Sequence, residues 1–321
     1  MTKRVRQGVL ALMIGVLLGL LAALLLVRAR MGSAPAGPAA SLAPGGTEAV
    51  SVPTAPPMPA GTPVPAAAEP SQTPVSPEPD RNEAVAELFR RFAGEHPGRW
   101  NLCFLALPDG EPVIWGSEEG PMVSASLIKL PIMGAVYEAV AAGSLDPAQC
   151  ENWLGPMITV SDNGSANSLV LLLGGGDADK GMAAVNDWCL RQGLTDTRQN
   201  RLMLVDNGLQ NYTGAADCAR LLAAIYRGDC VSPEASREML SLLLQQQVND
   251  RLPLGLPEGT PIAHKTGDLI GLCWADVGIV YSPGGDYVLC VISDGQASER
   301  EAKSATAALS REVYALMNPE T

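Results

Sequence analysis

The sequence predicts an α/β sandwich, in which one five-stranded antiparallel sheet carries the terminal helices on one face and an all-helical lobe on the other. Three observations predict this arrangement. Two strand-like segments come first, at residues 100–107 and 112–116. A helical middle follows, from residue 124 to about residue 247. Three more strand-like segments and a closing helix then complete the chain.

The first helix is predicted from the spacing of its apolar residues. Within residues 82–96, Val85, Leu88 and Phe92 recur at three- and four-residue intervals, which places them on one helix face. An Asp-Gly dipeptide, a strong signal for a tight turn, then separates the first two strand-like segments. We therefore expect these two segments to form a β-hairpin.

Glycines and polar stretches divide the helical middle into several helices. Breaks are expected at Gly143, at Gly164, in the glycine run 174–176 and in the irregular stretch 193–212. Thr213 is expected to cap the helix after the last break, because a side-chain oxygen can accept from the free N–H groups of a first turn. Ser232, which a proline follows directly, predicts the start of another helix.

The last quarter of the chain has the apolar pattern of strands. The three segments are residues 261–267, 276–282 and 286–293, with a Gly-Gly pair in the turn between the last two. A closing helix is expected from about Ser298 to Met317. These elements supply the remaining strands of the sheet and the second of its terminal helices.

The beginning of the chain does not have a globular pattern. Residues 8–27 are uncharged and apolar, and the strictly apolar part from Val9 onward would span roughly 28 Å as a helix at about 1.5 Å per residue, enough to cross a bilayer. The excess of basic residues before it favours an N-terminus inside the cell and the rest outside. We expect a cytoplasmic basic tip at residues 1–7 and an uncleaved transmembrane signal anchor at residues 8–30. The alternative is a cleaved signal peptide, which would give a secreted protein.

Residues 31–82 are predicted to form a Pro/Ala-rich disordered linker. Residues 31–80 hold 13 of the 26 prolines and show no hydrophobic period, so they cannot bury enough apolar surface to offset the entropy of ordering them. The linker would tether a catalytic domain, residues 83–321, in the extracytoplasmic space. We expect this single-pass membrane protein to be a monomer.

The charge of the chain argues against one class of partner. All 34 acidic residues follow residue 30, but only 17 of the 22 basic residues do, so the part predicted to be exported carries a net charge of −17. Nucleic-acid binding depends on basic side chains that neutralise phosphates. We therefore expect no nucleic-acid partner.

The seven cysteines and two histidines show no metal-binding spacing, and the sequence indicates neither a metal nor another cofactor. Several cysteines lie in apolar runs and are expected to be buried as small hydrophobic residues, and their odd number leaves at least one free thiol in a monomer. Because His96 and His264 are the two histidines, a Ser-His-Asp triad is poorly supported. His264 is expected to pack beside the adjacent Lys-Thr-Gly motif.

Three short motifs carry residues suited to acyl transfer, and they are Ser126-Leu127-Ile128-Lys129, Ser161-Asp162-Asn163 and Lys265-Thr266-Gly267. In the first, Ser126 and Lys129 lie one helical turn apart, so both side chains project from the same face. Burial would lower the lysine pKa from its usual value of about 10.4, so that Lys129 could accept the serine proton. A Ser-x-x-Lys pair is expected by chance roughly once in a chain of this length, but all three motifs in order are not.

These motifs, in the contexts SASLIKLP, MITVSDNGSAN and AHKTG, resemble the signature of class A β-lactamases and penicillin-binding proteins. The resemblance covers essentially all of residues 83–318 and implies a β-lactamase-like sandwich. It implies that Ser126 becomes acylated, that Lys129 takes its proton and that Ser161 relays a proton to the leaving nitrogen. It also implies an oxyanion hole made by the backbone N–H groups of Ser126 and Asp268.

The resemblance assigns substrate-binding roles to the second and third motifs. Asn163 would orient the amide of the substrate, and Lys265 and Thr266 would bind the carboxylate that β-lactams and D-Ala-D-Ala termini carry. Gly267 would let the substrate backbone lie against the strand without meeting a Cβ atom. Asp276 is expected to be structural.

The loop after the helical lobe departs from the family pattern Arg-x-Glu-Pro-Glu-Leu-Asn, whose first glutamate activates the water that releases the acyl group. Arg201 and Asn207 keep this register, but Met203 occupies the glutamate position. Asp206 and Asn207 are the remaining candidates for positioning water. Loss of a positioned general base typically slows its step by about 10²–10⁴-fold. We therefore expect acylation with slow deacylation.

Several interpretations of function remain open. The first is a membrane-tethered serine hydrolase that acts on β-lactams or related D-amino-acid amides and esters. The second is a D-alanyl-D-alanine peptidase with a peptidoglycan-like substrate, because it uses the same three motifs. The third is a β-lactam or cell-wall sensor that is acylated without turnover. An inactive scaffold is disfavoured because every polar residue of the three motifs is retained.

Overall fold

The computed structural model describes residues 81–319. The predicted basic tip, the signal anchor and residues 31–80 of the predicted linker lie outside this range. Within residues 81–319, none of the helices combines the length and the apolar character needed to cross a membrane.

The centre of the structure is the predicted five-stranded antiparallel sheet, with strand order β2-β1-β7-β6-β5. Its strands are β1 (Arg99–Ala106), β2 (Val113–Trp115), β5 (Ile262–Leu269), β6 (Cys273–Val280) and β7 (Tyr287–Asp294). The hairpin of β1 and β2 forms as expected, with Cys103 opposite Ile114. β6 begins at Cys273, three residues before the expected start, because it pairs with β5 along the whole length of both strands.

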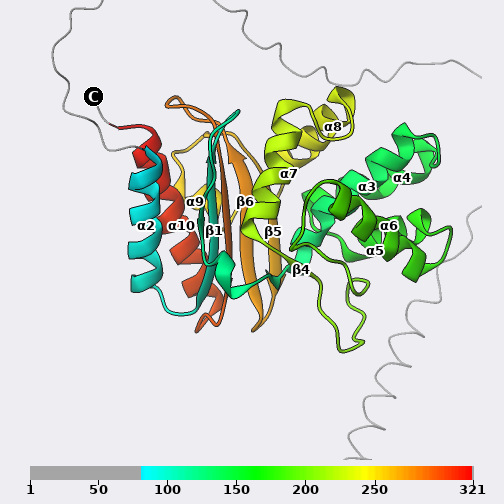
Figure 1. Cartoon of the computed structure of the whole chain (residues 1–321), viewed down its shortest axis with the longest axis horizontal. Helices are drawn as coiled ribbons and strands as arrows, with labels where there is room; N and C mark the ends of the chain where they lie inside the picture. Colours follow the sequence, from blue (N-terminus) through cyan, green and yellow to red (C-terminus); the bar gives the residue numbers. More distant parts are fainter. Residues whose placement is uncertain (1–80, 320–321) are drawn as a thin grey trace, which may run out of the picture. The chain divides into compact units, whose positions relative to one another are not determined.

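Helices cover both faces of the sheet (Figure 1). One face carries the terminal helices α2 (Arg81–Glu95) and α10 (Glu299–Met317). The other carries α7 (Ala215–Arg227), with the rest of the helical lobe beyond it. The other helices of the described chain are α3 (Lys129–Ala141), α4 (Pro147–Thr159), α5 (Asn163–Leu173), α6 (Ala178–Arg191), α8 (Pro233–Leu244), the short α9 (Leu252–Gly255) and the 3-10 turns η1 (Ser117–Glu119) and η2 (Ala125–Ile128).

Two hydrophobic cores follow from the two-fold alternation of side chains along the strands. On β1, Leu102 and Phe104 pack toward the terminal helices, whereas Cys103 and Leu105 pack toward the helical lobe. Because both faces are covered, the central strands β6 and β7 are buried along nearly their whole length. The predicted sandwich is therefore confirmed.

The helix that starts after residue 213 is capped differently from the prediction. Gly214, which has no side chain, takes the N-cap position of α7, and the first-turn N–H of Ala215 donates to Asn101 Oδ1 on β1 at 2.6 Å. Thr213 is buried, and its hydroxyl lies 2.9 Å from that of Thr197. The prediction of a Thr213 cap is wrong because this residue belongs to a strand whose pairing turns its side chain inward.

That strand is part of a second, two-stranded sheet that the sequence pattern does not indicate. Strand β3 (Met122–Val123) pairs with β4 (Tyr212–Thr213). The pairing joins the segment just before Ser126 to the end of the loop that contains Met203. A further backbone bond, from Ser124 N to Asn211 O at 2.8 Å, extends this connection.

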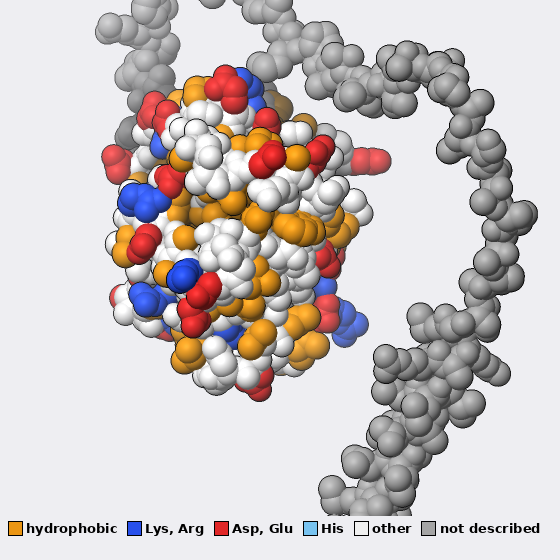
Figure 2. Space-filling model, turned by 90° about the vertical axis from the view of Figure 1, so that its right-hand side faces the viewer, with side chains coloured by type: hydrophobic (Ala, Val, Ile, Leu, Met, Phe, Trp, Pro, Cys, Tyr) orange, Lys and Arg blue, Asp and Glu red, His pale blue; other side chains and the backbone are white. Residues whose placement is uncertain are grey.

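Figure 2 views the molecule from the side of the helical lobe and shows apolar side chains spread among uncharged groups, with charged side chains mainly toward the edges of the face. All seven cysteines are buried and free, which confirms their expected place in the cores. Burial raises the pKa of the Cys189 and Cys218 thiols to about 12.

Candidate active site

The predicted nucleophile and base lie next to each other at the start of the helical lobe. Ser126 is in the 3-10 turn η2, and Lys129 opens the helix α3 that continues from it. Lys129 Nζ lies 3.0 Å from Ser126 Oγ. The four-residue motif therefore forms the serine–lysine contact within one turn, as expected from helix geometry.

Strained backbone flanks this contact on two sides. Ala125, directly before the nucleophile, has a φ of 43°, and Ser161 has a φ of 60°. Left-handed backbone costs a non-glycine residue roughly 1 kcal/mol or more and persists only where the surrounding structure enforces it. Asp162 then caps α5 by accepting from Ser165 N. The strain at Ser161 and the cap beside it direct the second motif toward Lys129.

Lys129 is fully buried among oxygen atoms of the first two motifs. Its Nζ contacts Ser161 O, lies 3.1 Å from Ser161 Oγ and lies 2.8 Å from Asn163 Oδ1. A neutral amine has two N–H groups, which suit the carbonyl oxygens of Ser161 and Asn163, and one lone pair, which suits the hydroxyl hydrogen of Ser126. The set of contacts thus accommodates Lys129 as the base that the serine requires.

Burial also changes the pKa of Lys129. Desolvation lowers the pKa of Lys129 to about 8, while the negative charge of Asp162 acts in the opposite direction. An amine with this pKa is partly unprotonated near neutral pH, unlike a solvated lysine. Lys129 can therefore accept the proton of Ser126.

The third motif lies on β5, an edge strand of the sheet, and its lysine contacts the side chain of Ser161. Lys265 on β5 donates to Ser161 Oγ at 2.9 Å, although the two residues are 104 positions apart in the chain. Its Nζ also donates to Thr266 O at 2.8 Å. Complete burial, and then the nearby charge of Lys129, lower the pKa of Lys265 well below its usual value. The hydroxyl of Ser161 therefore lies between two amines, where it can pass a proton.

Gly267 has a packing role that the sequence did not indicate. A Cβ atom built on it would lie 3.1 Å from Leu127 Cγ and 3.1 Å from Ser124 O. These contacts are tighter than ordinary van der Waals distances. The glycine therefore lets β5 approach η2 closely and holds the oxyanion-hole candidates Ser126 and Asp268 on adjacent elements.

The polar side chains of β5 differ sharply in their exposure to solvent. Lys265 is 0 % exposed and Thr266 is 1 % exposed, so neither side chain is presented to solvent. The side chain of Asp268, by contrast, is 42 % exposed. The amine of Lys265 is directed at Ser161 and not at solvent.

A small cavity of about 60 Å³ lies beside the nucleophile. Its lining residues come from all parts of the site, and they include Ser126, Asn163, Arg201, Met203, Gln210, Asn211 and Asp268. A wider hollow of about 580 Å³ between α4 and α8 is lined by none of the motif residues. The small cavity is therefore the one that can hold a reacting group next to Ser126.

The loop of residues 201–211 places an apolar group in this cavity. Met203 is 8 % exposed, its N–H donates to Asn167 Oδ1 at 2.7 Å, and its carbonyl accepts from Asn167 Nδ2 at 3.0 Å. Arg201 Nη2 donates to Gln210 Oε1 at 2.9 Å and closes the base of the loop. Met203 is thus held in place by two backbone bonds and brings no acid or base to the cavity.

The two loop residues proposed to position water lie elsewhere. Asp206 and Asn207 are both exposed, and neither lines the cavity beside Ser126. Asp206 Oδ1 accepts from Gly208 N at 3.3 Å and Asn207 Oδ1 accepts from Leu209 N at 3.1 Å, so both side chains stabilise the turn. The structure does not bring them together with Ser126. Gln210 and Asn211 occupy the cavity wall instead.

His264 packs beside the third motif, as expected. Its Nδ1 lies 2.9 Å from Asp276 Oδ1 and its Nε2 lies 2.9 Å from Asn249 Oδ1. The other oxygen of Asp276 accepts from Leu252 N at 3.1 Å. Asp276 is completely buried, and these bonds give it the structural role that was expected.

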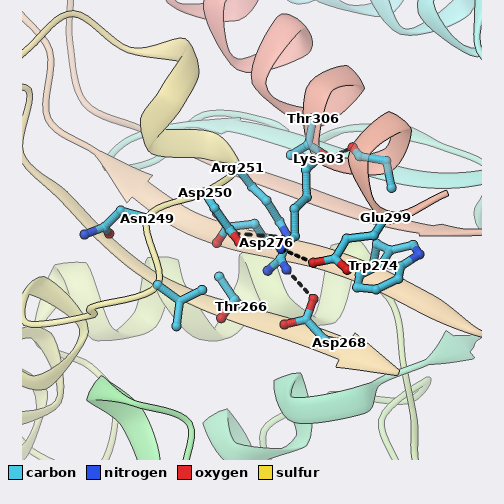
Figure 3. Close-up of polar contacts among 12 residues, drawn as sticks. Asn249, Asp250, Arg251, Thr266, Asp268, Trp274, Asp276, Glu299, Lys303 and Thr306 are labelled. Atoms are coloured by element: carbon cyan, nitrogen blue, oxygen red, sulfur yellow. Dashed lines mark hydrogen bonds and ion pairs between the residues drawn. The ribbon is translucent and has the colours of Figure 1, made fainter. Parts of the chain in front are cut away.

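Three residues of the site were not predicted from the sequence. Asn167 anchors Met203, and Asn211 anchors the start of its loop by accepting from Arg201 N at 3.0 Å. Arg251, which is fully buried, donates to the carboxylate of Asp268 (Figure 3) and to Ala275 O. Asn167 ends the MITVSDNGSAN context of the second motif, whereas Asn211 and Arg251 belong to segments without a motif, and each of the three acquires its role from a partner outside its own segment. Within residues 81–319, no cluster of three or more His, Cys, Asp or Glu side chains is arranged to hold a metal ion.

Comparisons with known proteins agree with this geometry. The family model described as the beta-lactamase enzyme family matches residues 81–151 and 149–317. A structure of PBP-A is 28% identical over 76% of this chain and 98% of its own, with a TM-score of 0.62. A point mutant of PBP-A, solved as an acyl-enzyme complex with penicillin G, is 27% identical over 72% of this chain and 95% of its own, with a TM-score of 0.64.

A beta-lactamase from Sphaerobacter thermophilus DSM 20745 shares the fold. It is 24% identical over 75% of this chain and 98% of its own, with a TM-score of 0.61. No curated protein matches the chain with comparable significance.

Proposed function

The chain belongs to the beta-lactamase enzyme family, and from this premise we propose that it is a serine hydrolase in which Ser126 is acylated by β-lactams or related D-amino-acid amides and then released slowly. The convergence of Ser126, Lys129, Ser161 and Lys265 carries this proposal. Their nitrogen and oxygen atoms form one continuous series of contacts of 2.9 to 3.1 Å.

In the proposed acylation, Lys129 accepts the proton of Ser126 while Ser126 Oγ attacks the carbonyl carbon. The backbone N–H groups of Ser126 and Asp268 stabilise the oxyanion. When the C–N bond breaks, Ser161 gives its proton to the leaving nitrogen and regains one from Lys129. Asn163, whose Oδ1 accepts from Lys129 at 2.8 Å, keeps the amine in place and leaves its own amide N–H for the substrate.

In the proposed deacylation, a water molecule must attack the acyl-enzyme without a carboxylate base. Met203, which stands at the glutamate position of the family pattern, lines the cavity beside Ser126, and Asp206 is exposed and does not line it. A missing general base costs about 10²–10⁴-fold in the step it serves. The acyl-enzyme is therefore long-lived, and turnover is limited by its release.

Intact-protein mass spectrometry with a penicillin at saturating concentration tests this function. We expect an adduct with the mass of the whole penicillin on the wild-type chain and none on the Ser126→Ala variant. The adduct should persist after free penicillin is removed. Equal nitrocefin turnover by both proteins would remove Ser126 from the mechanism, and complete hydrolysis without a lasting adduct would contradict slow release.

The likeness to PBP-A and the methionine in the loop favour a second candidate, a D-alanyl-D-alanine peptidase that uses the same acylation machinery. Release of D-alanine from a peptidoglycan pentapeptide, dependent on Ser126, would distinguish this peptidase from a β-lactam hydrolase. An absence of D-alanine in the presence of penicillin acylation would leave the first candidate.

We also propose that the catalytic domain works outside the cytoplasm on a membrane tether, as a monomer. The uncharged apolar run at residues 8–27 and the proline-rich segment after it support this proposal. Fractionation of cells that express the full chain, with protease added from outside, tests it. Recovery of the full-length chain from the soluble cytoplasm would contradict the tether.

A further inference from the structure

The hollow of about 580 Å³ between α4 and α8 is a pocket separate from the acylation site. Residues of α3, α4 and α8 line it, and none of its described lining residues belongs to the three motifs. Pockets that hold small organic ligands have volumes of roughly 300–1,000 Å³. The pocket between α4 and α8 is therefore large enough for such a ligand, whose chemistry can be inferred from the walls.

Most of the pocket wall is apolar. Tyr137 and Val140 contribute from α3, Leu154 from α4 and Leu242 from α8. Ligand sites of this size are lined mainly by such side chains, because burial of the apolar surface of a ligand drives its binding. The wall therefore suits a ligand with an apolar body.

The charged groups of the wall are all carboxylates. They are Glu151 on α4 and Glu234 and Glu238 on α8, and all three residues are exposed. Glu234 is paired with Arg237 at 2.7 Å, whereas the other two take part in no salt bridge within residues 81–319. Among the described residues that line the pocket, none is a lysine or an arginine. The charge of the wall is thus complementary to a cation.

One of these carboxylates lies beside the aromatic part of the wall. Burial raises the pKa of the Tyr137 hydroxyl, and the charge of Glu238 and a hydrogen bond to its carboxylate raise it further. The face of a tyrosine ring attracts cations, and a neighbouring carboxylate adds to this attraction. An ammonium group therefore finds both kinds of partner in the same part of the pocket.

The two helices that form the pocket are joined at one end. Gln246, which follows α8 and is buried, donates from Nε2 to Ile158 O at 2.8 Å, and Gln247 N donates to Thr159 O at 2.9 Å. Both acceptors belong to the last turn of α4, whereas its residues that line the pocket lie between 147 and 155. In Figure 1, α4 and α8 lie at the same end of the helical lobe. The pocket is therefore formed before a ligand enters it, which favours binding.

We propose that the pocket between α4 and α8 binds amphipathic organic cations, which are small molecules that combine an aromatic or aliphatic body with an ammonium group. The body lies against the apolar walls, and the ammonium group lies beside Tyr137 and Glu238. This site does not depend on the proposed acylation, because it shares no residue with the cavity beside Ser126.

Four probes separate the contribution of the charge from that of the apolar body. The compounds 4-phenylbutyltrimethylammonium, 5-phenylpentan-1-ol and 5-phenylpentanoate have similar bodies, and tetramethylammonium lacks the body. Their binding to the full chain in nanodiscs of zwitterionic lipid is measured by equilibrium dialysis, and binding to empty nanodiscs is subtracted. We expect the phenylbutyl cation to bind at least about fivefold more tightly than the alcohol, which is the scale of an exposed ion pair. The carboxylate and tetramethylammonium should bind more weakly than the alcohol, because one is repelled and the other buries little apolar surface.

Charge reversal locates the bound cation. Glu151→Lys and Glu238→Lys alter the two helices of the pocket, and each should remove the preference for the phenylbutyl cation over the carboxylate. The double variant should reverse this preference, and the alcohol should stay within about twofold throughout. Glu258→Lys is the matched control, because Glu258 is an exposed glutamate outside the pocket. The order of the probes should not change in this control.

The wild-type measurement decides even where a variant does not fold. Equal binding of the phenylbutyl cation and the carboxylate by the wild type would overturn the inference. A preference for the cation that survives in the folded double variant, or that is lost equally in Glu258→Lys, would also overturn it, because the probe would then bind elsewhere. Displacement of the cation by benzylpenicillin would place the probe beside Ser126 and have the same consequence. None of these results changes the penicillin adduct, which tests the proposed function separately.

Discussion

The backbone of Met203 and the side-chain amide of Asn167 form a reciprocal pair of hydrogen bonds. Met203 N donates to Asn167 Oδ1 at 2.7 Å, and Asn167 Nδ2 donates to Met203 O at 3.0 Å. The pair fixes a loop residue to helix α5, whose first turn contains Asn163 of the second motif. Position 203 is therefore set relative to the nucleophile by the helical lobe, whatever side chain it carries.

A glutamate at this position should restore the missing base. In Met203→Glu, the anchored backbone would place a carboxylate at the cavity beside Ser126, and release of the acyl group should accelerate by about 10²-fold or more. The decay of the penicillin adduct followed by mass spectrometry measures this effect. Met203→Gln is the control, because it has the same shape without the base. Equal adduct lifetimes in the two variants would show that position 203 does not govern deacylation.

Removal of the Asn167 side chain should change both the lifetime of the acyl-enzyme and the stability of the fold. Asn186 provides a matched comparison. It binds the backbone N–H and carbonyl of Gln199 with the same reciprocal geometry, at 2.7 and 2.8 Å, but Gln199 precedes the loop of residues 201–211 and does not line the cavity. Asn167→Ala and Asn186→Ala should each lower the free energy of unfolding by about 1–3 kcal/mol, because buried backbone groups lose their partners.

Denaturant unfolding measures the stability of both variants, and adduct decay measures the release step. We expect the adduct to decay faster in Asn167→Ala alone, because there Met203 loses the bonds that hold it in the cavity wall and water gains access to the acyl group. The same change in lifetime in both variants would mean that loop order in general, and not the position of Met203, controls release.

The pH dependence of acylation should follow the titration of the Lys129 amine. Its pKa is lowered by burial to about 8, and only the unprotonated amine can accept the serine proton. The acylation rate should therefore rise with pH and level off above about 8. Asp162 raises the pKa of Lys129, so Asp162→Asn should move the midpoint to lower pH. Asparagine caps helices about as well as aspartate, so stability should change little.

Asp177→Asn is the control for this shift, because Asp177 caps α6 in the same manner but does not act on the pKa of Lys129. The stopped-flow rate of acylation as a function of pH is the measurement. A midpoint that stays in place in Asp162→Asn, or that moves equally in Asp177→Asn, would argue against Lys129 as the titrating base.

The buried thiols should be inert in the native protein. Desolvation raises the pKa of Cys103 and Cys230 to about 12, and only thiolates attack disulfide reagents quickly. With Ellman's reagent near neutral pH, we expect no rapid reaction in buffer and reaction of all seven cysteines in denaturant. Rapid reaction of even one native thiol would contradict their placement in the core between the sheet and the helical lobe.

Much of this protein follows from local sequence. The Ser126–Lys129 contact needs only one turn of helix, because side-chain direction within a helix has a fixed period. Most strands of the sheet are visible as short apolar runs bounded by turn residues. The start of α10 after Ser298 and that of α8 after Ser232 were likewise predictable from capping. Such features depend on neighbours a few residues away.

The tertiary structure decided the contacts between distant segments. Lys265 meets Ser161 across 104 residues, Asn101 rather than Thr213 caps α7, and Arg251 neutralises Asp268. No periodicity relates these residues, because each pairing arises when the cores are buried and the remaining polar groups must find partners. The motifs alone indicated an acylating serine, whereas packing determined that Met203 and Asp268 line the cavity beside it.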